Sequence, residues 1–380
     1  MKLHRSTRLA AISISIVAVL AFLVASNRIA AAQDPAPSAQ AQPAPAAGGD
    51  PTGRSISIDV EVTDKAGHNI HGLQAGDFTL LDNKQPKRLL SFQAFDSKST
   101  PANPVHVVIV VDMINSDFTV VSREREQLGE FLKEDNGRLS HPASVAVLAD
   151  SGLKLQNGST NDGNELLASF DKSQSELRIV GRAEGFYGAK ERLEASLSQL
   201  SQLAAYESTL PGRKMILFIS PGWPMIAWAG IDADLNERAW VFNSIVRLSN
   251  GLRQGHIALY AVNPLELGGS NPFFYQNYLK AVPDVKHAEY ADLSLQVLAV
   301  HTGGLVQVRG MDIAGELNNA MRDANSYYTL TFESAPSDDP GDYHGLLVQV
   351  DKPDVTVRTT TGYYTRTPPQ NTPPPRSKAH

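Results

Sequence analysis

A run of apolar, mostly β-branched residues constrains the fold of this chain more than any other segment. Residues 105–111 read VHVVIVV, and Asp112 and the short polar step MINS follow them directly. A continuous run of this kind is typical of a parallel strand that is covered on both faces. Open α/β sheets bind ligands in the crevice beyond the carboxyl ends of their strands. The sequence therefore predicts a buried parallel strand that delivers the carboxylate of Asp112 to a candidate binding edge.

Further apolar segments after this strand alternate with helical ones. Alternating strands and helices predict a mostly parallel, doubly wound α/β sheet. The leucines of residues 188–205 recur at helical spacing, which is typical of a helix face packed against a core. Residues 232–252 and 288–300 show the same pattern, and we assign none of the three helices any chemistry. The expected strands lie near 105–111, 144–149, 214–219, 256–262 and 305–308.

Segments with strand patterns also flank the α/β region on both sides. Residues 55–62, SISIDVEV, alternate strictly between apolar and polar side chains, which predicts a half-buried strand. Three strands before the α/β region and three after it can complete one small antiparallel β-sandwich, with the α/β domain inserted between its halves. The other expected strands are 78–81, 88–95, 327–332, 346–350 and 355–364.

Both ends of the chain have the composition of segments outside the folded core. A basic start, an apolar run and the Ala-Ala-Ala at 30–32 predict a secretory signal peptide cut after Ala32. An uncleaved membrane anchor is the alternative, and it is the only membrane contact that we expect. Either reading predicts export, to a periplasmic, secreted or cell-envelope location. The predicted divisions are the signal at 1–32, a Pro/Ala-rich linker at 33–53, the sandwich halves at 54–100 and 325–366, the α/β domain at 101–324 and a disordered Pro-rich tail at 367–380.

Charge and cysteine content narrow the range of partners. The formal net charge is −6, and no Lys/Arg cluster occurs beyond the first eight residues. This balance gives no electrostatic reason to expect nucleic acid, so a protein partner is the default. The chain contains no cysteine, so neither a lipid attachment through cysteine nor a disulfide is available to an exported fold. Its stability must come from core burial.

The order of these features resembles the VWFA-related domain found widely in Acidobacteria. The most specific matches are V-T-D-x-x-G-x-x-I-x-G-L-x-x-x-D-F-x-x-x-D-N at residues 62–83 and R-x-x-x-G-Y-Y at residues 358–364. The resemblance covers nearly everything from Ser55 to Thr365. It implies that the doubly wound sheet is of the von Willebrand factor A type. In many relatives of the wider class it also implies a metal-ion-dependent adhesion site.

That site, as the resemblance implies it, has the pattern D-x-S-x-S, with a Thr from a second loop and an Asp from a third. Asp112 matches the first position and Ser116 the third, but Ile114 stands at the middle position and has no lone pair to offer. Phe186 and Tyr187 lie where the Thr is expected, and Ser220 replaces the Asp. The family pattern therefore implies a degenerate site in this chain.

Two interpretations of Asp112 stay open. It caps the following helix or accepts hydrogen bonds from loop backbone N–H groups, as Asp commonly does at helix starts. Alternatively, Asp112 and Ser116 hold Mg²⁺ or Ca²⁺, with Asn115, Asp117 and Ser220 supplying further oxygen ligands. The small number of matching ligands favours the first interpretation, so we predict no tightly bound cofactor.

Two loops rich in aromatic residues are expected at the same edge of the sheet. The first follows Ser220 and the second covers residues 271–278. Aromatic side chains gathered on loops favour protein or glycan contact over phosphate chemistry, although the same side chains can instead pack down on the fold. The candidate contact residues are Trp223, Met225, Trp228, Phe273, Phe274 and Tyr275.

No G-x-S-x-G, H-E-x-x-H, P-loop or G-x-G-x-x-G motif occurs in the chain. We therefore expect a non-enzymatic, exported protein-interaction or adhesion-type module that binds its partner at the carboxyl edge of the sheet without a tightly held metal. The alternatives are a metal-dependent adhesion or assembly domain that uses Asp112 and Ser116, and a cryptic hydrolase at the same edge.

Overall fold

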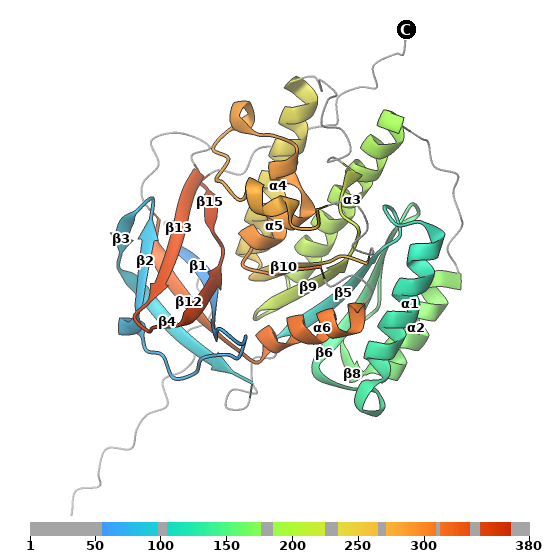
Figure 1. The fold of residues 1–380 in the computed structure, drawn as a ribbon, viewed down its shortest axis with the longest axis horizontal. Coiled ribbons are helices and arrows are strands. Elements are labelled where there is room, and N and C mark those ends of the chain that lie inside the picture. Colours follow the sequence, from blue (N-terminus) through green and yellow to red (C-terminus); the bar gives the residue numbers. More distant parts are fainter. Residues whose placement is uncertain are drawn as a thin grey trace, which may run out of the picture. The chain divides into compact units, whose positions relative to one another are not determined.

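The structure is a computed structural model that describes residues 55–97, 105–175, 185–224, 235–264, 271–308, 312–334 and 343–365 (Figure 1). The predicted signal peptide, linker and tail lie outside these residues. No helix among the described segments is long and apolar enough to cross a membrane.

The central sheet is mixed and mostly parallel. Its strand order is β11-β10-β9-β5-β6-β7, with β8 paired to β6 beside this path. Strands β11, β10, β9, β5 and β6 run parallel, whereas β7 and β8 pair with β6 in the antiparallel sense. The strands are β5 (His106–Asp112), β6 (Arg138–Ala149), β7 (Gly152–Leu155), β8 (Thr160–Asp162), β9 (Lys214–Ile219), β10 (Ile257–Val262) and β11 (Val306–Gln307).

Strand β5 lies in the middle of this sheet, and its side chains enter two different cores. Val108 and Val110 pack in one hydrophobic cluster with residues of α3, α4 and α5. Val107, Ile109 and Val111 pack in a second cluster with residues of α1, α2 and α6. Helices therefore cover both faces of the sheet, and the prediction of a mostly parallel α/β sheet is confirmed. The helices are α1 (Phe118–Lys133), α2 (Gly163–Ser175), α3 (Gly185–Glu207), α4 (Leu235–Gln254), α5 (Leu295–His301) and α6 (Ile313–Met321).

Short 3-10 helices replace part of one predicted helix. Residues 288–300 were expected to form a single helix, but a regular α-helix begins only after Ser294, whose extended backbone precedes α5. The sequence pattern did not reveal this break. The 3-10 helices are η1 (Ala75–Asp77), η2 (Glu134–Gly137), η4 (Phe274–Tyr278), η5 (Val285–His287), η6 (Ala291–Leu293) and η7 (Arg322–Ala324).

Two four-stranded antiparallel sheets combine strands from both sides of the α/β region, and we call them together the β unit. One has the order β14-β1-β12-β4 and the other β15-β13-β2-β3. Apolar residues of β1, β2, β12, β13 and β15 share one hydrophobic cluster. The strands are β1 (Ser55–Asp64), β2 (Phe78–Asp82), β3 (Gln85–Lys87), β4 (Leu89–Asp96), β12 (Ser326–Glu333), β13 (Tyr343–Val350), β14 (Val355–Thr359) and β15 (Gly362–Tyr364).

The two sequence motifs behind the family resemblance meet inside the β unit. The buried carboxylate of Asp82 pairs with His344 Nδ1 at 2.7 Å and accepts a hydrogen bond from the Tyr363 hydroxyl at 3.1 Å. Asn83 takes a left-handed backbone, and its side-chain oxygen accepts a hydrogen bond from Gly345 N. The D-N end of the first motif and the G-Y-Y end of the second therefore join β2 to β13 and β15. In this chain both motif ends have a structural role.

Candidate functional site at the carboxyl edge of the central sheet

Asp112, the last residue of β5, is fully buried and surrounded by hydrogen-bond donors. Its Oδ1 accepts from the backbone N–H groups of Ile114 at 2.9 Å and Asn115 at 3.1 Å. Its Oδ2 accepts from Asn115 Nδ2 at 2.7 Å and from the Ser220 hydroxyl at 2.7 Å. Two donors on each oxygen fill the roughly four lone-pair positions of a carboxylate. Hydrogen bonds to this one side chain therefore join the loop after β5 to the residue that follows β9.

Helices α3 and α1 each contribute one side chain to these hydrogen bonds. The side-chain amide of Asn115 also donates to the hydroxyl of Ser196 on α3 at 2.9 Å. The hydroxyl of Ser116 donates to Glu124 Oε1 on α1 at 3.1 Å, and Glu124 is fully buried. Asp112, Asn115, Ser116, Ser196, Ser220 and Glu124 together form what we call the Asp112 network.

Asp117 has a different role from the other candidates. Its carboxylate accepts from Val120 N at 2.9 Å and caps the first turn of α1. The first interpretation of Asp112 offered two roles, and this geometry separates them, because Asp117 caps the helix while Asp112 accepts the loop N–H groups.

The two buried acids of the network both have raised pKa values. Burial raises the pKa of Asp112, although its hydrogen bonds from Asn115, Ser220 and Ile114 partly offset this effect. Burial raises the pKa of Glu124 to about 8, the negative charge of Asp112 adds to the rise, and the hydrogen bond from Ser116 opposes it. Glu124 is therefore mostly protonated at neutral pH, and the network then carries a smaller negative charge than two ionised carboxylates would give.

A divalent cation does not fit, in this geometry, the position that the sequence resemblance implies for it. Mg²⁺ and Ca²⁺ need oxygen lone pairs directed at the ion, but all four positions on Asp112 already accept protein hydrogen bonds. The Ser220 hydroxyl and the Asn115 amide present hydrogens to Asp112 Oδ2, and Ile114 is apolar and fully buried. Among the described residues, no group of three or more His, Cys, Asp or Glu could hold a metal ion. Neutral donors thus take the lone pairs of Asp112 that an ion would need.

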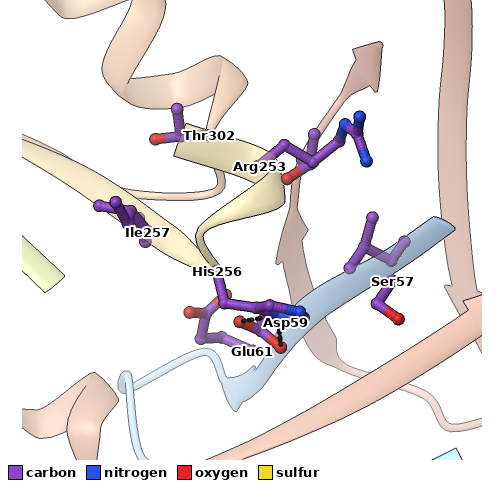
Figure 2. A pocket seen from close by; sticks show the side chains of 10 residues that line it. Ser57, Asp59, Glu61, Arg253, His256, Ile257 and Thr302 are labelled. Atoms are coloured by element: carbon purple, nitrogen blue, oxygen red, sulfur yellow. Dashed lines mark hydrogen bonds and ion pairs between the residues drawn. The ribbon is translucent and has the colours of Figure 1, made fainter. Parts of the chain in front are cut away.

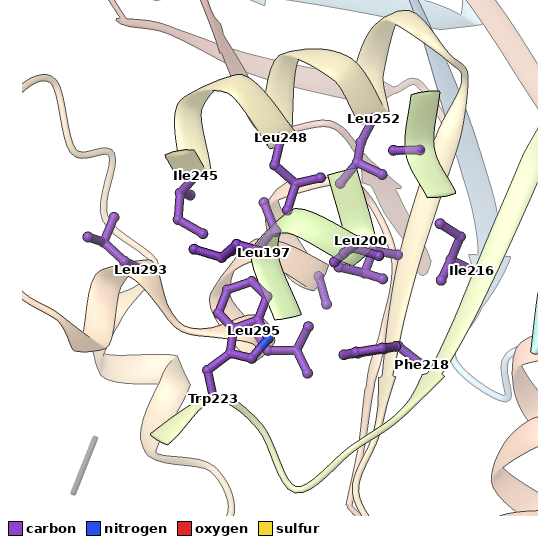
Figure 3. Close-up of a cluster of buried hydrophobic side chains, with 14 of the residues drawn as sticks. Leu197, Leu200, Ile216, Phe218, Trp223, Ile245, Leu248, Leu252, Leu293 and Leu295 are labelled. Carbon is purple, nitrogen blue, oxygen red and sulfur yellow. The ribbon is translucent and has the colours of Figure 1, made fainter. Parts of the chain in front are cut away.

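The first aromatic loop is only partly described, and its first tryptophan belongs to the core. Trp223 is 3% exposed and packs with Leu295 and neighbouring apolar side chains of α3 and β9 (Figure 3). The interpretation of Trp223 as a partner contact is therefore wrong, because its ring is folded onto the sheet. The other two candidates on this loop, Met225 and Trp228, lie outside the described residues.

The second aromatic loop contains one exposed ring. Phe273 is 45% exposed, whereas Tyr275 is 8% exposed and therefore unavailable as a contact. Phe274 is half-buried and lies in edge-to-face contact with Tyr275, with ring centroids 6.3 Å apart. Burial thus removes Tyr275 from the predicted contacts, and Phe273 is the exposed aromatic residue on this described loop.

A second buried polar cluster lies where the β unit contacts the opposite edge of the central sheet. Arg213, which is 1% exposed, donates to Glu61 on β1 and to the backbone oxygen of Asp323, and its guanidinium lies 4.7 Å from the centre of the Tyr327 ring. Asp59, also on β1, pairs with His256 Nδ1 at 3.3 Å beside a cavity of about 10 Å³ (Figure 2). Because a water needs about that much space, we regard the cavity as part of the packing.

Sequence reasoning missed Glu124 and Ser196. Both are polar residues inside helices, and neither stands at a strand end where a ligand edge is expected. The only available signal was an acidic residue on a helix that begins directly after the candidate loop.

Comparison with protein-family models finds no match, and comparison with curated proteins finds none either. The chain is similar to solved structures at low identity. The human COPII-coat protein Sec24c has a TM-score of 0.29 and 10% identity over 69% of this chain and 44% of that one, so this chain spans less than half of it. The TFIIH p34 N-terminal domain has a TM-score of 0.27 and 12% identity over 59% and 99%. The SpRpn10 VWA domain has a TM-score of 0.27 and 14% identity over 56% and 95%. At these scores the likenesses carry no argument about function.

Proposed function

We propose that this chain is an exported, non-enzymatic protein-interaction module with a von Willebrand factor A type α/β domain inserted in a β-sandwich. It binds a protein partner at the carboxyl edge of the central sheet and needs no divalent cation. The observation that carries the proposal is the Asp112 network. It stands where open α/β sheets bind ligands, and it satisfies its central carboxylate with neutral donors.

The strand order supports the α/β part of the proposal. Strand β5 is central, β9 and β10 follow on one side, and β6 with the antiparallel β7 follows on the other. The two sheets of the β unit, which draw on both ends of the described chain, support the sandwich.

The metal-dependent alternative has one observation in its favour. Asn115 Oδ1 and Glu124 Oε2 are buried acceptor oxygens without a hydrogen-bond partner among the described residues. A cation bound there would displace the donors now on Asp112 and would need Glu124 to lose its proton.

Calorimetric titration distinguishes these two functions. Mg²⁺, Ca²⁺ and Mn²⁺ are titrated separately into the chain from Gln33 onward after chelator treatment, with Asp112→Ala as the control variant. We expect no saturable heat in either protein. Saturable binding that Asp112→Ala abolishes would overturn the metal-free proposal and establish the alternative.

A matched pair of exposed aromatic residues tests the binding edge. Phe273 is 45% exposed on the loop that we assign to the carboxyl edge, and Tyr206 is 48% exposed near the end of α3, which leads to the start of β9. A partner purified by cross-linking to the parent protein should bind Phe273→Ser at least about tenfold more weakly, because an exposed aromatic anchor is lost. It should bind Tyr206→Ser unchanged. The reverse pattern would place the contact at the other edge.

Export is tested on the full chain. We expect the mature protein in the envelope or medium fraction of an expressing bacterium, with Gln33 as its first residue. A cytosolic protein that keeps Met1 would contradict this part of the proposal.

A further inference from the structure

An open cavity lies beside the start of β6, at the end of the central sheet opposite the Asp112 network. The end of α1, η2, the first residues of β6 and the end of α6 surround it, and its volume is about 250 Å³. Pockets for drug-sized ligands measure roughly 300–1,000 Å³, so a ligand that fills this one is smaller. The floor is apolar, and the buried side chains that line it are Phe131, Leu139 and Met321.

Two positive and two negative side chains also line this cavity, and most of them have no partner. Glu134 accepts a hydrogen bond from Asn318 Nδ2 at 2.7 Å, which joins the end of α1 to α6. The side chains of Asp135, Arg138 and Arg322 are exposed, and within the part of the chain that the structure describes they have neither a hydrogen bond nor an ion pair. Opposite charges that line one small cavity without pairing remain available to a ligand.

An unusual backbone places two of these side chains at the cavity. Asp135 and Asn136 have φ values of 47° and 60°, and Gly137 follows them at 83°. Consecutive left-handed residues other than glycine are uncommon, and they persist where the surrounding structure fixes them, often at ligand sites. Here Asn164 of α2 contributes, because its Nδ2 donates to the backbone oxygen of Asn136 at 3.3 Å. The turn therefore sets where Asp135 and Arg138 leave the backbone.

We propose that this cavity binds a free α-amino acid with an apolar side chain. Arg138 begins β6 and Arg322 begins η7, so two guanidinium groups from different elements hold the carboxylate. Each can donate two parallel hydrogen bonds to it. Asp135 pairs with the ammonium group, and the apolar side chain covers the floor. A ligand with both charges is favoured over a simple anion, which would also meet the two carboxylates of the lining.

The first test uses L-leucine and analogues that each lack one feature. Saturation-transfer NMR on the chain from Gln33 onward should show saturable leucine binding with a dissociation constant of about 0.1–1 mM, since ion pairs at exposed side chains are weak. We expect at least about tenfold weaker binding of 4-methylpentanoate, which has no ammonium group, and of 3-methylbutylamine, which has no carboxylate. Glycine should also bind more weakly, because it has no apolar side chain to bury.

Two results of this titration would overturn the proposal. The first is no saturable binding of leucine, methionine or phenylalanine at about 20 mM, a concentration far above the expected dissociation constant. The second is binding of 4-methylpentanoate as tight as that of leucine, because the cavity would then be a site for a simple carboxylate.

Substitutions test the two charges separately. Arg138→Gln and Arg322→Gln should each weaken leucine binding at least about tenfold, because each removes charged donors from the carboxylate. The matched control is Arg88→Gln, since Arg88 is likewise exposed and unpaired among the described residues but lies outside the cavity. It should bind leucine like the parent. Leucine binding that is unchanged in both cavity variants would place the site elsewhere and overturn the proposal.

Asp135→Asn tests the ammonium contact without disturbing the turn, because Asn tolerates the left-handed backbone. This variant should bind leucine at least about fivefold more weakly and should bind 4-methylpentanoate no more weakly than the parent does, since a negative charge is removed from the lining. An equal loss for both ligands would exclude Asp135 as the partner of the ammonium group. An unchanged unfolding midpoint for each variant shows that the fold is intact.

Discussion

Buried carboxylates lie at both edges of the central sheet, and the two edges stabilise them by different means. At the carboxyl edge, Asp112 and Glu124 are surrounded by hydroxyl and amide donors and have no cationic partner among the described residues. At the opposite edge, Asp59 and Glu61 of the β unit face Arg213 and His256.

The pKa values follow this difference. At the carboxyl edge burial prevails, and the pKa values of Asp112 and Glu124 are raised. Burial also acts on Asp59 and would raise its pKa. The hydrogen bond and charge of His256, together with the charge of Arg213, outweigh burial and hold the pKa of Asp59 below its ordinary value. At the opposite edge, cations therefore face the carboxylates, and we call this cluster the charge-matched joint. At the candidate site, the described residues place no cation beside the two buried acids. Buried acids with raised pKa values of this kind are more typical of functional sites.

The largest expected effect is at the charge-matched joint. Arg213→Met removes the buried cation that faces Glu61 and leaves that carboxylate without its partner. Breaking a buried pair from one side should reduce the free energy of unfolding by about 3–5 kcal/mol. Urea unfolding measures the loss. Arg125→Met is the control, because its pair with Asp171 is about half exposed and should be worth less than about 1 kcal/mol. A loss equally small at Arg213 would show that the joint is not held by charge.

A smaller loss is expected from Asp112→Ala at the other edge. The variant leaves the Ser220 hydroxyl, the Asn115 amide and two loop N–H groups without their acceptor. Unsatisfied buried donors each cost about 1–3 kcal/mol, but the loop can rearrange, so we expect a total loss of about 3 kcal/mol. Chelator should not change the unfolding midpoint of the parent. A midpoint that falls to the variant's value when chelator is added would instead show that Asp112 acts through a metal.

The difference between the two edges also explains which side-chain contacts the sequence could predict. Asp112, Ser116 and Ser220 follow apolar strands, and the carboxyl ends of parallel strands meet at one edge, so their proximity was predictable. Arg213 and Glu61 are 152 positions apart, on segments whose pairing depends on how the β unit packs on the α/β sheet. No local pattern encodes such a contact. Trp223 shows a third case, because an apolar loop residue fits an exposed contact and a folded-down core residue equally well, and only the packing distinguishes them.

Unlike the two preceding variants, a substitution of Glu124 should stabilise the fold at high pH. The unfolded chain releases this proton near pH 4.5, and the folded chain holds it until about pH 8, so the parent loses stability as pH rises across that window. Glu124→Gln keeps the shape and removes the titration. At pH 8 it should raise the free energy of unfolding by about 2 kcal/mol, because one pKa unit corresponds to about 1.4 kcal/mol and relaxation reduces the full value. Unfolding at pH 5 and pH 8 measures this difference. A variant that is as pH-dependent as the parent would mean that another group titrates.

The smallest effect, at His256, tests the charge balance of the joint. The hydrogen bond to Asp59 raises the pKa of His256 above its ordinary 6.5, although burial opposes the rise. The pair therefore stabilises the fold fully below about pH 6.5 and loses this contribution as pH rises through the higher folded pKa.

His256→Asn is the appropriate variant, because His256 has a φ of 53° and Asn tolerates the left-handed region. The loss should be at most about 1 kcal/mol at pH 6, since the histidine side chain is 33% exposed and its charge is screened. It should be smaller at pH 9, because the parent histidine loses its positive charge as pH rises through its raised pKa. His68→Asn removes the matching pair with Asp64 on an exposed turn and should have no measurable effect at either pH. An equal loss from His256→Asn at both pH values would assign the role of His256 to packing, and Arg213 would then be the main source of charge balance for Asp59.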